Sequence, residues 1–176
     1  MHIRILTIAV LAASCLAAGA SRAQQPPAAN PLDVIPDVMP FDIPYGPPIS
    51  ADHATAAIRA AIAEAKKHNW KMNVAVVDSG GNLVAFERMD GAQLGSIAVS
   101  QHKARVAATY RRETKAFENG VQGGMVYQLS LDGMIASRGG IPLVVNGKLV
   151  GAIGSSGGTG SQDEVCAKAG AAVINK

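Results

Sequence analysis

The sequence predicts an α+β domain in which helices pack against an antiparallel sheet. Two observations carry this prediction. Hairpin signals occur twice, over 72–88 and 141–155, and helical periodicity occurs before, between and after them. Because hairpins join neighbouring antiparallel strands, this order excludes a dinucleotide-binding fold built on parallel crossovers.

Residues 1–23 have the pattern of a cleavable secretory signal. Arg4 precedes an uncharged apolar run of about 14 residues, which is too short for a membrane span, since a span needs about 20. We expect cleavage before Gln24, with Ala20 as the alternative. A lipid-modified Cys15 is disfavoured, because no large aliphatic residue stands three positions before it. We therefore expect a periplasmic or secreted protein without an integral membrane span.

Residues 24–49 are predicted to form an extended arm or linker, because eight of the nine prolines lie there. Residues 50–176 suit one compact domain. Cleavage of the signal removes two of the sixteen basic residues and none of the thirteen acidic ones, which leaves a net charge of +1. No basic face for nucleic acid is indicated. Cys166 would be the only cysteine left, so no internal disulfide is expected.

The first half of the domain begins with a helix over 51–68. Ser50 is its expected N-cap, and small apolar residues recur at helical spacing after it. A valine-rich strand over 72–77 follows, and a glycine turn at 78–81 leads into an alternating strand over 82–88.

The middle of the domain is predicted to hold a second helix over about 94–110, whose small residues let it lie close to the sheet. The segment between Thr114 and Gly140 carries weaker signals. We predict a short helix near 123–130, followed by a loop or a short strand.

The last part of the domain carries the clearest local signal in the chain. Strands over 141–145 and 148–155 flank Asn146-Gly147, a pair that tolerates positive φ at both turn positions. In the final helix, Ser161 and Glu164 match a capping box.

A glycine-rich stretch between the last strand and the last helix matches G-x-S-x-G at residues 154–158. Hydrolases with this motif have a histidine base after the serine, whereas no histidine follows His102 here, so a hydrolase is disfavoured. The amides of 157–161 lead into a helix N-terminus, where they either hold an anion or only make a tight connection.

Metal-site signatures such as C-x-x-C and H-E-x-x-H are absent from the sequence. Three histidines lie beyond the signal: His53, His68 and His102. His68 continues the apolar stripe of the first helix, so we expect its imidazole on the buried side.

Four stretches together resemble the GlcG/HbpS family of haem-binding proteins, which is related to the C-terminal domain of PduO-type corrinoid adenosyltransferases. The stretches are VAVVDSGGNLVAFERMDGA at 74–92, HKARVAA at 102–108, GGIPLVVNGKLVGAIGSSGG at 139–158 and DEVCAKAGAA at 163–172. The resemblance implies a profilin-like domain, with an antiparallel sheet of about five strands, that forms dimers or larger rings and binds haem. The family's recurring hydrophilic positions match Asp78, Arg88, Asp90, Ser96, Lys103, Thr114 and Asp163, whereas His102 departs from the family pattern.

Haem needs an apolar slot, an axial donor and groups that hold its propionates. We expect a crevice between the sheet and its helices, with His68 as the leading iron ligand and His102 as the second. Lys103, Arg88 or the amides that include Gly157 and Gly158 are expected to receive the carboxylates. Family members differ in iron ligation, with a histidine of the first helix and a threonine both proposed, so the ligand stays open.

The function expected from these residues is an exported haem binder for storage, sensing or transfer, without a defined catalytic centre. The alternative is an enzyme or sensor for a small organic acid such as a 2-hydroxy acid. In that case Asp78, Lys103, Thr114 and the glycine loop would form a polar pocket. No nucleophile and base pair is evident in the sequence.

Overall fold

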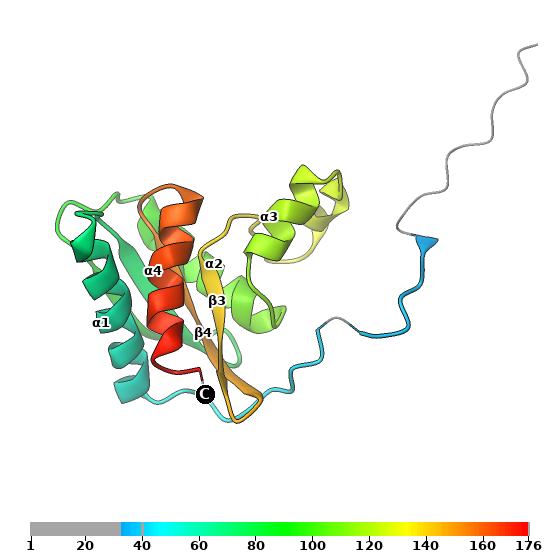
Figure 1. The fold of residues 1–176 in the computed structure, drawn as a ribbon, viewed down its shortest axis with the longest axis horizontal. Coiled ribbons are helices and arrows are strands. Elements are labelled where there is room, and N and C mark those ends of the chain that lie inside the picture. Colours follow the sequence, from blue (N-terminus) through cyan, green and yellow to red (C-terminus); the bar gives the residue numbers. More distant parts are fainter. Residues whose placement is uncertain (1–32, 40, 176) are drawn as a thin grey trace, which may run out of the picture. The chain divides into compact units, whose positions relative to one another are not determined.

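The structure is a computed structural model that describes residues 33–39 and 41–175. The predicted signal peptide, residues 1–23, lies outside the described residues. The domain has the α+β architecture that the sequence predicts (Figure 1). Its elements are α1 (Ala51–Lys67), β1 (Asn73–Asp78), β2 (Leu83–Arg88), α2 (Ser96–Thr109), α3 (Lys115–Gln122), the 3₁₀ helix η2 (Val126–Ser130), β3 (Gly140–Val145), β4 (Lys148–Ser156) and α4 (Gly160–Ala172).

The sheet has four strands in the order β2-β1-β4-β3, and every neighbouring pair is antiparallel. Both predicted hairpins are confirmed, and Asn146 and Gly147 have φ of 50° and 71° at the second turn. The sequence leads to an expectation of about five strands. No fifth strand is found in the described residues, but residues 44–49 run beside β4 with a parallel bridge between Tyr45 and Leu149 and backbone hydrogen bonds to Leu149 and Val150.

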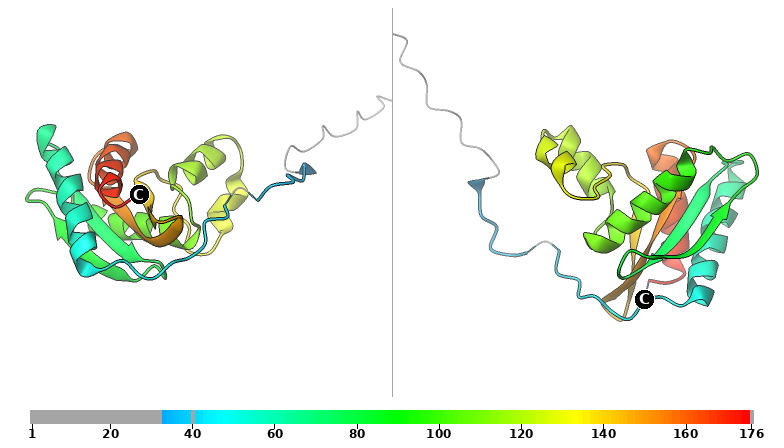
Figure 2. Two further views of the ribbon diagram at one scale, coloured as in Figure 1. Left: turned by 60° about the horizontal axis from the view of Figure 1, so that its bottom comes forward. Right: turned by 180° about the vertical axis from the view of Figure 1, so that it is seen from behind.

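Helices cover both faces of the sheet. On one face, α1 and α4 pack on side chains such as Val74 and Val76, and on the other α2 packs on Ala75 and Val77 (Figure 2). This division follows from the strand period of two, which sends successive side chains to opposite faces. Both interfaces are filled by buried apolar side chains, so the predicted crevice between sheet and helices is wrong for the described part of the chain.

Helices α1 and α4 both begin at a capping residue. The sequence prediction placed the α1 cap correctly and the α4 cap two residues too late. The Ser50 side chain accepts a hydrogen bond from the His53 amide at 3.2 Å, as expected. At α4 the capping box is formed by Thr159 and Gln162, two residues before the predicted pair. The predicted partner, Glu164, instead lies in the first turns of the helix, where it pairs with lysines.

The short helix predicted near 123–130 is found as the 3₁₀ helix η2, whereas the α-helix before it was missed. The α-helical segment is α3, which ends at Gln122, and Gly124 follows with a φ of 94°. A residue in that left-handed region terminates a helix, and η2 is the helical segment between it and β3. Both α3 and η2 lie outside the layers of the sheet domain, beyond β3 (Figure 1).

Candidate functional site

A buried ion pair joins helices from opposite faces of the sheet. The Lys103 ammonium of α2 lies 2.7 Å from a carboxylate oxygen of Asp163 in α4, and both side chains are 3% exposed or less. The same ammonium lies 3.4 Å from the carbonyl oxygen of Ser155, near the end of β4. Lys103 therefore reaches from the α2 face to the α4 face at the end of β4.

A glycine makes room for this passage. Gly139 has a φ of 116°, and a Cβ built there would lie 3.2 Å from the Lys103 ammonium and 2.8 Å from the Ser155 carbonyl oxygen. A side chain would thus meet the ion pair and adopt a disfavoured backbone conformation as well.

The charges of Lys103 and Asp163 are satisfied within the protein, as in an ion pair that stabilises the fold. Burial raises the pKa of the Asp163 carboxyl, and the nearby Lys103 charge opposes that shift without cancelling it. The other carboxylate oxygen accepts a hydrogen bond from the Gly158 amide at 3.0 Å. Because the ammonium is 2% exposed and already paired, it has no face open to a ligand carboxylate.

Thr114 belongs to the same buried region. Its hydroxyl oxygen accepts a hydrogen bond from the Gly140 amide at 2.9 Å, and its own amide donates to the Gly140 carbonyl at 3.0 Å. Asp78 lies elsewhere, in the β1–β2 turn, where its carboxylate accepts hydrogen bonds from the Gly80 and Asn82 amides at 2.9 Å. The polar pocket proposed for a small acid is therefore not assembled in the described structure.

His68 does not lie on the buried side of the first helix, so that prediction is wrong. The helix ends at Lys67, and His68 is its C-cap with a φ of −106°, which turns the side chain out of the apolar stripe. Its imidazole is 45% exposed, lies 3.3 Å from a carboxylate oxygen of Glu64 and stacks on Trp70 at 4.3 Å. One ring nitrogen is engaged by Glu64, which leaves the other for a ligand.

His102 is held on the opposite face of the sheet. Its Nε2 lies 2.8 Å from the carbonyl oxygen of Gly133, so that nitrogen carries the proton in the neutral ring. His53 is exposed in the first turn of α1. The three imidazoles thus lie on different parts of the surface and form no common site.

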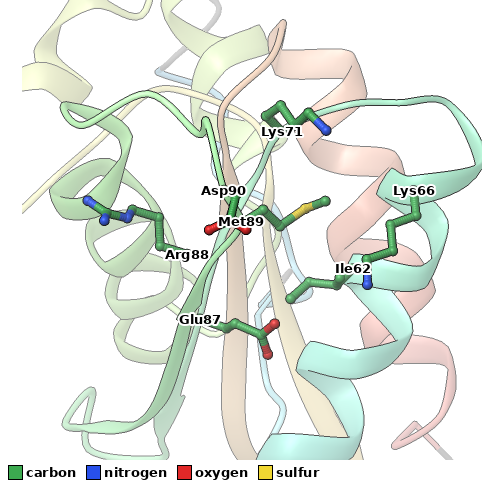
Figure 3. A pocket seen from close by; sticks show the side chains of 7 residues that line it. All are labelled: Ile62, Lys66, Lys71, Glu87, Arg88, Met89 and Asp90. Atoms are coloured by element: carbon green, nitrogen blue, oxygen red, sulfur yellow. The ribbon is translucent and has the colours of Figure 1, made fainter.

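A surface groove runs between α1 and the edge strand β2 (Figure 3). It consists of a pocket of about 340 Å³ at the β2 end of the molecule and a neighbouring pocket, also of about 340 Å³, that shares Ile62, Lys66 and Glu87 with the first. We call the two together the α1–β2 groove. The remaining lining residues are Arg59, Ala63, Lys71, Arg88, Met89 and Asp90.

Charge and apolar surface alternate along β2 at this groove. Glu87 and Met89 point toward α1, whereas Arg88 points to the other side of the strand (Figure 3). Lys66 and Lys71 border the groove from the α1 side, and no ion pair of either lysine is found among the described residues. The groove therefore has an apolar floor of Ile62 and Met89 and a rim of mixed charge, because the carboxylates of Glu87 and Asp90 line it together with the lysines. Such a surface suits a ligand with an apolar body and charged groups at its edge.

The structure brings some of the predicted site residues together and separates the others. Lys103, Thr114 and the Gly158 amide belong to the buried region, with Gly157 beside them in the preceding loop, whereas His68, His102 and Arg88 lie at separate places on the surface. The lysines of the groove and Met89 were missed. A signal for Lys66 existed, because Arg59, Ile62 and Lys66 recur at helical spacing along α1, whereas Lys71 lies beyond the end of the helix.

The described residues hold neither a metal-binding cluster nor a membrane-spanning helix. Within residues 33–39 and 41–175, no cluster of three or more His, Cys, Asp or Glu side chains is arranged to hold a metal ion. No helix in that part of the chain is both long and apolar enough to cross a membrane.

Comparison with known proteins gives consistent matches. The family model described as "Haem degrading protein HbpS-like" matches residues 49–172. Protein GlcG of Escherichia coli K12 is 44% identical over 108 residues, which cover 61% of this chain and 81% of GlcG. A double mutant of HbpS from Streptomyces reticuli superposes with a TM-score of 0.67 at 31% identity and covers 85% of this chain and all of its own. A complex of PduOC with haem superposes with a TM-score of 0.66 at 28% identity, covering 73% of this chain and 96% of PduOC.

Proposed function

The chain belongs to the HbpS-like family, and from this premise we propose that it binds haem. The observation that carries the proposal is the similarity to PduOC, whose solved structure is a haem complex. The match covers 96% of the PduOC chain and 73% of this chain. A bound haem would supply an iron centre for ligand binding or one-electron redox chemistry. The residues of this chain would hold, orient and shield it.

The α1–β2 groove fits one half of a haem site. Haem carries two propionates on an apolar ring, and the groove offers three cations, Lys66, Lys71 and Arg59, that have no ion pair in the described part of the chain. They lie around Ile62 and Met89, with Glu87 and Asp90 as the opposing charges. His68 lies in the turn between these two lysines, and it has a ring nitrogen that is not engaged by Glu64. We assign the lysines as propionate partners, in place of the buried Lys103. We keep His68 as the leading axial ligand, although its imidazole does not line the groove and would have to turn away from Glu64 and Trp70 to reach the iron.

A haem in this groove needs a second wall. The apolar floor is small and the helix–sheet interfaces are filled, so one face of the macrocycle would remain in water on a single chain. A second copy of the chain is the natural cover, and we propose that the protein is a homo-oligomer in its haem-bound state.

The proposed place of action is the periplasm or the extracellular space. Support for this comes from the N-terminal sequence, in which one basic residue, an uncharged apolar run and small residues follow each other. Fractionation of cells that express the full chain, with N-terminal sequencing of the exported form, tests it. A protein that stays in the cytoplasm with residues 1–23 intact would contradict the assignment.

Haemin titration tests the proposed function. We expect the wild type to give a Soret band that saturates at a defined stoichiometry, and His68→Ala to shift that band and weaken binding by at least about tenfold. His53→Ala is the matched control, because it removes an exposed histidine at the other end of the same helix. A wild type without saturable haemin binding would reject the function, while normal binding by His68→Ala would reject only the ligand.

A further inference from the structure

A second hollow of about 380 Å³ lies beside the edge strand β3. We call it the β3 hollow. Its walls come from the segment before the family domain, from the connection between α2 and α3, and from β3 itself. Most of its lining is apolar: Phe41, Ile43, Ile141, Pro142 and Val144.

Arg112 is the unusual residue of this hollow. Its guanidinium lies between two aromatic rings, 3.6 Å from the centre of Phe41 and 4.1 Å from that of Phe117. Its Nε is buried and has no hydrogen-bond partner among the described residues. Burial lowers the pKa of the guanidinium, although an arginine stays protonated at neutral pH. The Nε end of the guanidinium is therefore desolvated, and no carboxylate pairs with it among the described residues.

The carboxylate nearest in sequence does not supply that counter-ion. Glu113 lines the same hollow, but its carboxylate lies 3.5 Å from the ammonium of Lys168. Arg138 shows what a satisfied arginine looks like in this protein, because its Nε donates to Glu118 at 2.6 Å and a terminal nitrogen lies 3.6 Å from Glu164. Arg112 has the burial of a structural arginine without the partner of one.

The other polar groups of the hollow are already engaged. Arg111 donates a hydrogen bond to the Ile43 carbonyl at 3.1 Å, which fixes the segment that carries Phe41. The Asn175 side chain accepts from the Val144 amide at 2.9 Å and covers the edge of β3. Arg112 is thus the polar group left for a ligand, and the rest of the hollow favours hydrocarbon.

We propose that the β3 hollow binds a small monocarboxylate with an apolar body, whose carboxylate pairs with Arg112. A guanidinium presents a planar fork that matches one carboxylate in a bidentate manner. Two arginines and Glu113 line the hollow, which gives it a net charge of +1 and favours a singly charged anion over phosphate. The volume lies at the lower end of the range for small-molecule sites, which suits an aryl or short aliphatic acid.

This site is separate from the proposed haem groove. Phe41, Ile43 and Asn175 lie outside residues 49–172, the part of the chain that the family model matches. The hollow is also built at β3, the edge of the sheet opposite β2. The inference therefore does not depend on haem binding, and either can fail without the other.

The first experiment needs no variant. Phenylacetate and its neutral isostere phenylacetamide are titrated into the full chain by calorimetry, with glycolate as a polar acid. We expect phenylacetate to bind at one site per chain and to raise the midpoint of thermal unfolding. Phenylacetamide and glycolate should each bind at least about tenfold more weakly, because one lacks the charge and the other the apolar body. Equal binding of phenylacetate and its amide would overturn the proposal.

The second experiment assigns the site. Arg112→Met should lose at least about tenfold in phenylacetate affinity, and Arg112→Lys should lose less because it keeps the charge. Arg105→Met is the matched control, since Arg105 lies on α2 outside the hollow. Unchanged phenylacetate affinity in Arg112→Met would overturn the assignment. A parallel loss of haemin affinity in that variant would overturn the separation of the two sites.

Discussion

Lys103 and Arg112 are two cations removed from water, the first completely and the second in part, and the fold pairs only the first. Lys103 is buried between α2 and α4 and meets the Asp163 carboxylate at 2.7 Å. Arg112 lies between two aromatic rings beside an open hollow and meets no carboxylate among the described residues. A buried charge costs free energy unless it is paired. The fold supplies the partner of Lys103, whereas we infer that a ligand supplies the partner of Arg112.

The largest effect that follows from this comparison is on stability. Lys103→Met should lower the free energy of unfolding by about 3 to 5 kcal/mol, because it leaves Asp163 buried without a counter-charge. Arg112→Met should change it by about 1 kcal/mol or less, since no ion pair is lost. Urea unfolding monitored by circular dichroism measures both.

Lys148→Met, at the exposed first residue of β4, is the control for the loss of a lysine charge. The double variant Lys103→Met with Asp163→Leu should recover part of the lost stability, because neither charge then remains buried. If Lys103→Met and Arg112→Met lowered the free energy of unfolding equally, the contrast between a paired and an unpaired cation would be contradicted.

The region around Asp163 is buried from solvent, and this gives a second prediction about the nearby Cys166 thiol. Burial raises the pKa of the Cys166 thiol to about 12 from 9.0, and the negative charge of Asp163 adds to the shift. At pH 8 the thiolate fraction should fall about a thousandfold, so iodoacetamide should leave Cys166 unmodified in the native protein. Peptide mapping by mass spectrometry reads this out, with urea-unfolded protein as the positive control. Rapid labelling of the native thiol would show that this region opens to solvent.

The smallest expected effect is on the pH dependence of stability, and it concerns the Glu164 carboxylate, next in the chain after Asp163. Burial acts to raise the pKa of Glu164, but hydrogen bonds from Lys168 and Lys115 outweigh it and lower the pKa below 4.5. A lowered pKa gives stability that is present above the unfolded value and is lost as the pH falls through the folded value. Asp163 has the opposite sign, because its pKa is raised.

We therefore expect the wild type to lose stability below about pH 4.5, and Glu164→Gln to lose it less steeply with falling pH. Urea midpoints measured between pH 3 and pH 6, in a range of about three units around the ordinary carboxyl pKa, compare the two. The exposed Glu87→Gln serves as the control. Parallel curves for wild type and Glu164→Gln would contradict the assignment of the acid sensitivity to Glu164.

The sequence by itself determined what depends on neighbours along the chain. The Asn146-Gly147 turn, the Ser50 cap and the periodicity of α1 are local signals, and all three are found where they were expected. A local signal fails where two neighbouring positions match the same pattern. At α4 both Thr159-Gln162 and Ser161-Glu164 satisfy the capping-box pattern, and the structure uses the pair that lies two residues earlier than predicted.

Only the tertiary structure decided which distant side chains meet. Lys103 and Asp163 are 60 residues apart, and nothing near either one indicates that they form a pair around the end of β4. His68 continues the spacing of the buried stripe but lies just past the end of the helix, so its imidazole turns to solvent. Arg112 differs from Arg138 only in what the fold places beside it. Burial and pairing are properties of packed elements, and packing depends on contacts that no single stretch of sequence contains.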